Sequence, residues 1–210
     1  MDGSEIDLVL LRHCRTRDNL SGLIPRRIAA LDSEGRAEAT QIAMYLANMG
    51  RRLGSLTCSP LARAQQTAEI IGKLIRIKPV CIDELSEMEF GEAEGIPEQE
   101  FASRFPEHFA VMKDPTNPCF HWPDGESRYE FAMRCLRALQ RCVAFASSGA
   151  VACVTHWCSI GFLLATVLDG TWFRWQEYTP PSWRCIDQIR IDGSLRATYW
   201  KRTEIDTDAH

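Results

Sequence analysis

The chain has 210 residues, of which 45% are hydrophobic and 25% are charged, and its formal net charge is -4. This composition is typical of a globular protein with one substantial core, and we expect a single domain over residues 1–210. The acidic balance excludes a general attraction to nucleic acid or to an anionic membrane, and no segment resembles a signal peptide or a membrane span. We therefore expect a soluble, cytoplasmic protein that binds neither nucleic acid nor membrane.

The first predicted elements are a strand and a capped helix. The apolar run over residues 6–11 predicts a buried strand, which ends directly in the polar cluster RHCRTRDN. Apolar residues at helical spacing over 33–48 predict a helix that Asp32 caps and that ends at Gly50. Further strands are predicted at 55–58 and 79–82.

Residues 88–128 have a different composition, with many prolines, acids and aromatic residues and weak periodicity. We expect an irregular lid or insertion that runs over the edge of the sheet, and long loops of this kind often cover a site. Its aromatic side chains could select the substrate or form a small local core. The sequence leaves these two alternatives open.

The last third of the chain completes the predicted fold. An apolar stripe from Phe131 to Ala146 predicts a helix packed on the sheet, and residues 150–155 predict a buried strand. Alternating residues around Asp192 and Gly193 predict a β-hairpin. Strands that alternate with helices are typical of α/β proteins. We therefore predict a three-layer α/β/α fold with a mixed, mainly parallel central sheet, and a site at the carboxyl ends of its strands.

The cysteines do not provide an obvious chemistry. Their number, nine, is odd, and no two form a CxxC pair, so the sequence indicates neither a disulfide framework nor a zinc site. A cysteine phosphatase needs an arginine at a set spacing after its nucleophile, and at that spacing Cys14 and Cys158 reach leucines. Cys135 does reach Arg141, but the residues between them lack glycine and are typical of a helix interior. Phosphate-binding loops of the Walker and GxGxxG types are absent. We expect no metal and no cofactor.

Histidine and arginine are the remaining candidates for catalysis. Arg12 and His13 follow the first predicted strand, and His156 follows the strand over 150–155. Either histidine taken alone is more simply explained as a satisfied core residue, and Arg63, on a predicted helix, as a solvated surface charge. Two histidines at strand ends, each within a longer motif, favour a shared site instead.

Four blocks of the sequence resemble the motifs of one family. They are LRHCRTRDN at 11–19, SPLARAQQTA at 59–68, LSEMEFGEAEG at 85–95 and VTHWCSIGFLLA at 154–165. In order and spacing they resemble the motifs RHGxTxxN, SPLxRAxxTA, LxExxFGxxEG and VxHGG of the histidine phosphatase superfamily, the phosphoglycerate-mutase-like proteins. The resemblance spans most of the chain and is closer to the phosphatase branch. It implies a metal-independent phosphoric monoester hydrolase that works through a phosphohistidine intermediate.

The resemblance also implies roles for individual residues. It makes His13 the nucleophile, Glu87 the proton donor and His156 a catalytic and phosphate-binding residue. The other matched positions bind phosphate or lie near the mouth of the family's site: Arg12, Arg63, Thr16, Asn19, Glu126 and Ser127. A local turn explains the threonine and the asparagine nearly as well, and a helix cap explains the PDGES block at 123–127 nearly as well.

Each role agrees with the chemistry of its side chain. The planar guanidinium groups of Arg12 and Arg63 suit the three oxygens of a transferring phosphoryl group. Neighbouring arginine charges would keep His13 neutral, with its second ring nitrogen donating to a carbonyl. Partial burial would hold Glu87 protonated until transfer. Glu89 is the alternative acid, because alternation along an extended segment would point both carboxylates to the same side.

The chain departs from the family motifs at several positions. Cys14 and Trp157 replace glycines, so both side chains are expected to add bulk near the phosphate. Trp157 could supply an aromatic wall for the substrate, because Ala93 stands where the family commonly has tryptophan. Arg15 and Arg17 could favour a second anionic group on the substrate, or could be solvated loop charges.

These observations predict hydrolysis of a small phosphomonoester, a phosphorylated metabolite. One alternative is a non-catalytic phosphate-ligand-binding protein of the same fold, in which Cys14 and Trp157 spoil the geometry of attack. A weaker alternative is a cofactor-dependent phosphoglycerate mutase, although the chain lacks the RHYG-type block of the mutases. The sequence leaves open the natural substrate and the oligomeric state, monomer or homodimer.

Overall fold

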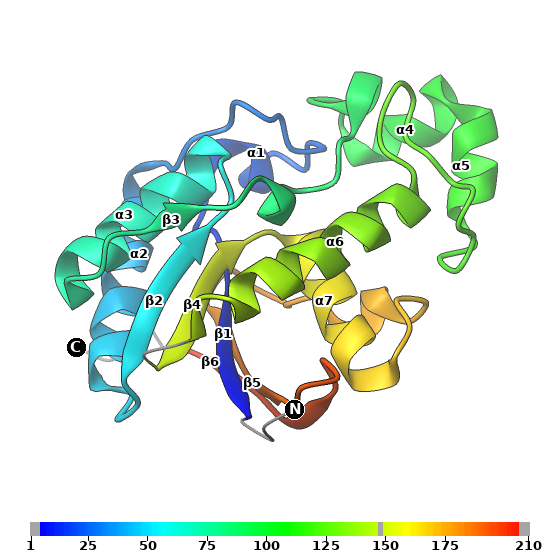
Figure 1. Cartoon of the computed structure of the whole chain (residues 1–210). Helices are drawn as coiled ribbons and strands as arrows, with labels where there is room; N and C mark the ends of the chain where they lie inside the picture. The colour runs from blue at the N-terminus through cyan, green and yellow to red at the C-terminus, as the bar shows by residue number, and fades with distance from the viewer. Residues whose placement is uncertain (1–4, 147–148, 206–210) are drawn as a thin grey trace.

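The computed structural model describes residues 5–146 and 149–205, in which strands and helices alternate along the chain (Figure 1). The strands are β1 Ile6–Arg12, β2 Leu53–Cys58, β3 Val80–Cys81, β4 Ala150–Thr155, β5 Cys185–Ile191 and β6 Ala197–Glu204. The α-helices are α1 Arg17–Leu20, α2 Ser33–Asn48, α3 Ala62–Ile75, α4 Glu98–Arg104, α5 Pro106–Met112, α6 Arg128–Val143 and α7 Trp157–Asp169. Short 3-10 turns are η1 Asp83–Leu85, η2 Gly91–Ala93 and η4 Trp175–Tyr178.

The strands form one mixed sheet in the order β3-β2-β4-β1-β5-β6. The pairs β3–β2, β2–β4 and β4–β1 are parallel, whereas β5 is antiparallel to β1 and β6 is antiparallel to β5. The predicted hairpin is therefore confirmed as β5–β6, with its turn at Asp192 and Gly193. The predicted mixed, mainly parallel sheet is also confirmed.

Helices cover both faces of the sheet, which confirms the three-layer arrangement (Figure 1). Alternate residues of β1 point to opposite faces because the side-chain period of a strand is two. Leu8 and Leu10 belong to the hydrophobic cluster that includes α6 and α7. Val9 and Leu11 belong to the cluster that includes α2 and α3. A strand that is buried on both faces explains the uninterrupted apolar run that precedes the polar cluster.

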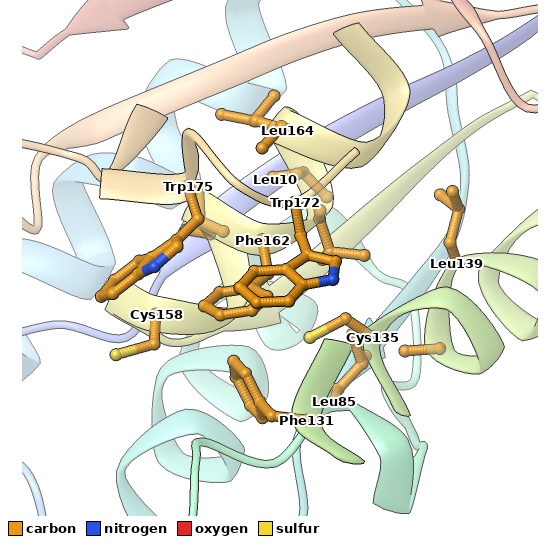
Figure 2. Close-up of a cluster of buried hydrophobic side chains, with 14 of the residues drawn as sticks. Leu10, Leu85, Phe131, Cys135, Leu139, Cys158, Phe162, Leu164, Trp172 and Trp175 are labelled. Atoms are coloured by element: carbon orange, nitrogen blue, oxygen red, sulfur yellow. The ribbon is translucent and has the colours of Figure 1, made fainter. Parts of the chain in front are cut away.

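An aromatic group forms the centre of the cluster between the sheet, α6 and α7 (Figure 2). The ring centroid of Phe162 lies 4.8 Å from Phe131, nearly perpendicular to it, and 5.4 Å from Trp172, nearly parallel to it. Phe162 also lies 4.9 Å from Trp175 of η4. These contacts join α6, α7 and η4 into one packed layer.

Two predicted helices have the caps that their sequences indicate. Asp32 accepts a hydrogen bond from Gly35 N at 2.8 Å at the start of α2, and this helix ends at Asn48, just before Gly50. Ser127 caps α6 in a capping box with Glu130. Side-chain acceptors at these positions satisfy backbone N–H groups that have no partner inside the helix.

Residues 88–128 are more regular than their composition predicts, because they contain η2, α4 and α5. The expectation of an irregular excursion is therefore wrong for this part of the segment. Both α-helices are only two turns long, which is too short for a periodic pattern to be detected. Phe101 of α4 packs against Phe105 and Trp122 at ring distances of 5.5 and 5.0 Å, so these aromatic residues do form a small local core.

Candidate active site

Three polar residues directly follow the carboxyl ends of neighbouring parallel strands. They are His13 after β1, Ser59 after β2 and His156 after β4. Two backbone hydrogen bonds continue the strand ladder at this edge, from His13 N to Thr155 O at 2.8 Å and from Ser59 N to Val154 O at 3.0 Å. Parallel strands end at the same edge of a sheet, so this register brings the three side chains together.

His13 is buried and oriented by hydrogen bonds at both ring nitrogens. Its Nδ1 lies 2.8 Å from Cys14 O, and its Nε2 accepts a hydrogen bond from Arg63 Nε at 3.2 Å. Since a carbonyl oxygen only accepts, Nδ1 carries the proton and Nε2 presents a lone pair. Burial, and then the charges of Arg63 and Arg12, hold the pKa of His13 well below its ordinary value. The ring is therefore neutral at physiological pH.

Two guanidinium groups lie beside this histidine. Arg63, from the first turn of α3, is 2% exposed and also donates from Nη1 to Arg26 O at 2.9 Å. Arg12 ends β1, and its guanidinium carbon lies 6.0 Å from the ring centroid of Trp183. Arg12 Nε is buried without a hydrogen-bond partner among residues 5–146 and 149–205. A bound phosphate oxygen would satisfy this donor.

His156 lies next to His13, at a distance of 5.1 Å between ring centroids. Its Nε2 is hydrogen-bonded to Ser59 Oγ at 2.7 Å, and its buried Nδ1 has no partner in the described part of the chain. Burial lowers the pKa of His156 well below its ordinary value, and the charge of Arg63 lowers it further. Ser59 therefore fixes the ring, and Nδ1 remains as a buried polar atom without a partner among the described residues.

Glu87 is the buried carboxyl group of the site, with 5% exposure. It accepts hydrogen bonds from Cys158 N at 3.1 Å, from Met88 N at 3.0 Å and from Ser159 Oγ at 3.4 Å. Burial raises the pKa of Glu87, and the two backbone hydrogen bonds oppose this effect in part. The carboxyl group is thus held in a fixed position at the start of α7, in surroundings that raise its pKa.

Glu89, the alternative acid, lies elsewhere. Its carboxylate is exposed and pairs with Arg27 Nη1 at 2.9 Å. Residues 87–90 are not part of a strand, so strict alternation does not apply there and the two carboxylates do not share a side. The expectation that they point together is wrong, and burial distinguishes Glu87 from Glu89.

The backbone around Glu87 is held by Arg134 of α6. This guanidinium donates to Ser86 O at 2.7 Å and to Glu87 O at 3.1 Å, and it pairs with Glu126 at 2.6 Å. Glu126 is thus joined to the site through Arg134 and does not line the cavity described below. Ser127 likewise acts as the cap of α6.

The loop after His13 is organised by its own side chains. Thr16 caps α1, and its hydroxyl donates to Asn19 Oδ1 at 2.8 Å. Arg15 pairs with Asp32 at 3.0 Å and with Glu34 at 2.7 Å, at the start of α2. Its guanidinium is therefore committed to α2, whereas Asn19 lies in the cavity wall.

The two residues that replace family glycines differ in where their side chains lie. Cys14 is fully buried in the cluster between the sheet, α2 and α3, and its N–H donates to Thr67 Oγ1 at 3.1 Å. The expectation that Cys14 adds bulk near the phosphate is therefore wrong, because its side chain points into the core. Trp157 does line the cavity, where its Nε1 donates to Pro180 O at 3.1 Å.

A cavity of about 770 Å³ opens at this edge of the sheet. It brings together six of the residues expected at the site, namely Arg12, His13, Asn19, Arg63, Glu87 and Trp157. His156 contacts His13 from a fully buried position outside the lining. Thr16, Arg15, Glu126 and Ser127 are also outside it. Within residues 5–146 and 149–205, no three His, Cys, Asp or Glu side chains come together as a metal-binding group.

Sequence reasoning missed several residues of the site. Ser59 lies inside the quoted SPLARAQQTA block, and its position directly after β2 was the available signal. Trp175 and Trp183 also line the cavity, but they come from connections after α7 that carry no motif. Their place in the wall depends on tertiary packing alone.

Comparisons with known proteins agree with this geometry. The chain is 30% identical over 166 residues to the "probable phosphoglycerate mutase GpmB" of Proteus mirabilis, covering 78% of this chain and 75% of that protein. It is 26% identical over 162 residues to the "uncharacterized phosphatase PhoE" of Bacillus subtilis, covering 77% of each. The alpha-ribazole phosphatase of Shigella flexneri has the same fold, with a TM-score of 0.81 at 23% identity over 92% of this chain and 94% of that one.

The helices of the described residues include none with the length and apolar character that a membrane crossing needs.

A family model matches most of the chain. Residues 8–197 match the model of the histidine phosphatase superfamily, branch 1, a range that contains all of the site residues above. This match, together with phosphatase- and mutase-named relatives, places the chain among phosphatase- or mutase-type enzymes. The chain therefore belongs to the histidine phosphatase superfamily.

Proposed function

We propose that this protein is a metal-independent phosphatase that hydrolyses a phosphomonoester through a phosphohistidine on His13. The observation that carries the proposal is the tautomer of His13, which its two hydrogen bonds determine. Its Nδ1 proton is directed at Cys14 O, and its Nε2 lone pair lies against Arg63. This is the tautomer that nucleophilic attack through Nε2 requires.

Attack begins when the phosphoryl group takes the place of Arg63 Nε at the lone pair of His13. The P–N bond forms at Nε2 while the ester P–O bond breaks, and the imidazole gains positive charge that the Cys14 carbonyl stabilises. The leaving oxygen takes a proton from the Glu87 carboxyl group. The raised pKa of Glu87 supports this role because it keeps the proton available.

Hydrolysis of the intermediate reverses the proton transfer. Water attacks phosphorus, the ionised Glu87 accepts one of its protons, and the P–N bond breaks. The electron pair of that bond returns to Nε2, so His13 becomes neutral again and inorganic phosphate leaves. Both steps spread negative charge over the three equatorial oxygens of the phosphoryl group.

Arg12 and Arg63 would stabilise this charge. Both guanidinium groups line the cavity beside His13, and Arg12 Nε is a buried donor without a partner in the described chain. His156 Nδ1 is a second buried polar atom without a partner in the described chain, and it is a donor when the Ser59 hydroxyl donates to Nε2. Pre-positioned donors of this kind stabilise a transition state more than a flexible, solvated ground state.

The mutase alternative rests on the similarity to GpmB. A mutase would transfer the phosphoryl group from His13 back to a second hydroxyl of the substrate, whereas a phosphatase transfers it to water. The two reactions are distinguished by their products. Release of inorganic phosphate without isomerisation of a phosphoglycerate supports the phosphatase.

The test is hydrolysis of p-nitrophenyl phosphate by the wild type and by His13→Ala, with excess chelator present. We expect activity that survives chelation and is lost in the variant, and an acid-labile phosphoryl group on the wild type after rapid quenching. His108→Ala, which replaces a histidine of α5 outside the cavity lining, is the matched control. A wild type that is inactive here and on a panel of phosphorylated metabolites would favour the non-catalytic binding protein.

A further inference from the structure

The cavity beyond His13 and its arginines is lined mainly by aromatic and apolar side chains. Its volume of about 770 Å³ is far larger than a phosphate and a short carbon chain need. Tryptophan is the most frequent residue type in the lining, with four members in the described residues. They are Trp122, Trp157, Trp175 and Trp183.

Two of these indoles are fixed by hydrogen bonds that draw their N–H groups into the protein. Trp157 Nε1 donates to Pro180 O at 3.1 Å, and Trp183 Nε1 donates to Glu38 Oε1 at 2.6 Å. Each side chain thus satisfies its one polar atom within the protein. What remains for a ligand is the carbon surface of the ring.

The other two indoles differ from each other. Trp122 Nε1 lies 3.0 Å from Met88 Sδ. Trp175 is 6% exposed, and its Nε1 is buried without a hydrogen-bond partner in the residues that the structure describes. Three of the four indoles therefore have their N–H donor used within the protein, and a hydroxyl-rich ligand would find few partners on these rings.

The aromatic wall, by which we mean these four tryptophans, is also held in place by packing. The rings of Trp157 and Trp175 meet edge to face at 5.8 Å, and Trp175 packs against Phe162 in the cluster of Figure 2, where it lies on the side of Cys158. A Cβ at Gly161 would lie 2.6 Å from Trp175 O, so only glycine lets η4 pack this closely on α7. Rigid aromatic surfaces bind flat ligands at little cost in conformational entropy.

Beyond the reaction centre, five polar side chains of the described residues line the cavity: Asn19, Glu98, Lys113, Arg128 and Gln176. Arg128 lines the cavity, but its guanidinium donates to the carbonyls of Met112, Asp114 and Asn117. Lys113 lies with its Nζ 5.1 Å from the ring centroid of Phe109. The donors that a sugar would need are thus partly used by the protein.

Building on the phosphatase function proposed above, we propose that the substrates are phosphomonoesters whose leaving group carries a flat aromatic ring system. The ring lies against Trp157, which is the specificity-determining residue. The phosphate end is bound by Arg12 and Arg63, and the aromatic end fills the space between Trp157 and the 88–128 segment. A substrate of this class matches both the size and the chemistry of the cavity.

The test compares naphthylethyl phosphate with a hexose phosphate esterified at its primary hydroxyl, because both release primary alcohols. We expect kcat/KM to favour the naphthyl ester by at least about tenfold. Trp157→Ala should lower kcat/KM for the naphthyl ester by about tenfold, mainly through KM, and for the hexose ester by less than about twofold. Trp157→Phe should retain most of the preference.

Tyr199→Ala is the control, since this aromatic residue of β6 lies outside the cavity lining and is 43% exposed. Equal kcat/KM for the two esters, or an equal loss on both in Trp157→Ala, would overturn the inference. A binding experiment with non-hydrolysable phosphonate analogues of the two esters, measured by calorimetry, separates this inference from the proposed function. If neither ester is hydrolysed but the wild type binds the naphthyl phosphonate about tenfold more tightly than the hexose phosphonate, and this preference depends on Trp157, only the catalytic proposal fails. Without that difference in affinity, the inference fails too.

Discussion

Replacing Glu87 by glutamine tests the proton donor directly. The substitution keeps the shape of the side chain but removes its proton, so its effect must depend on how much the leaving group needs one. For an alkyl phosphate, whose alkoxide is strongly basic, we expect kcat/KM, which reports the step that releases the leaving group, to fall by roughly a hundred- to ten-thousandfold. For p-nitrophenyl phosphate, whose leaving anion is stable, kcat/KM should fall by less than about tenfold.

The structure also indicates how much this substitution should lower the free energy of unfolding. Both carboxyl oxygens of Glu87 accept backbone hydrogen bonds, one from Cys158 N and the other from Met88 N. A glutamine amide has one oxygen, so its NH2 group must face one of these N–H donors. A buried unsatisfied group costs about 1–3 kcal/mol, and each kcal/mol lowers the Tm of a chain this long by about 2–4 °C. The variant should therefore melt about 2–12 °C lower and remain folded at assay temperature.

The pH profile provides an independent measure. Burial raises the pKa of Glu87 and lowers that of His13, so kcat/KM should fall on the acid side as His13 is protonated and on the alkaline side as Glu87 ionises. Glu87→Gln should abolish the alkaline fall for alkyl substrates and leave the acid fall in place. An equal loss on alkyl and nitrophenyl substrates, with the alkaline limb retained, would refute the assignment of Glu87 as the acid.

Two further predictions concern the histidines. Because the pKa values of His13 and His156 are lowered in the folded state, the unfolded chain binds more protons than the folded chain below about pH 6.5. The free energy of unfolding, measured by urea titration, should therefore decrease by up to about 2.7 kcal/mol for each unit that the pH falls below this value. His156→Asn should halve this slope, and an unchanged slope would contradict the burial of a neutral His156. Ser59→Ala should lower kcat/KM by about threefold to thirtyfold through loss of the 2.7 Å contact with His156, whereas Ser194→Ala in the β5–β6 turn should have no effect.

The elements that sequence reasoning located correctly are those that local patterns determine. The apolar runs of β1 and β4 ended in polar residues, and the parallel register then brought His13 and His156 together. The hairpin and the capped helices depend on a few neighbouring residues, so their signals are local. The motif blocks identified the other residues of the site, such as Arg63 and Glu87.

The sequence did not predict how several side chains near the site are oriented, because their orientation depends on contacts with residues elsewhere in the fold. Arg15 is adjacent to the nucleophile in sequence, yet Asp32 and Glu34 draw it to α2. Cys14 lies one residue from His13 in sequence, yet its side chain is buried in the hydrophobic cluster between the sheet, α2 and α3. Glu87 and Glu89 are indistinguishable in the pattern until burial separates them. Each of these outcomes is decided by tertiary contacts.

The contacts of Arg134 with Ser86, Glu87 and Glu126 have a consequence for how this scaffold can change. One guanidinium anchors the peptide that carries Glu87 to α6, without using any atom of the aromatic wall. One brace of Glu87 is thus independent of the surface proposed for substrate selection, whereas the other, from Cys158 N and Ser159 Oγ of α7, is not. Engineering new selectivity by single wall residues can therefore preserve the alignment of Glu87 through Arg134, whereas exchange of η4 as a whole would disturb α7, on which it packs.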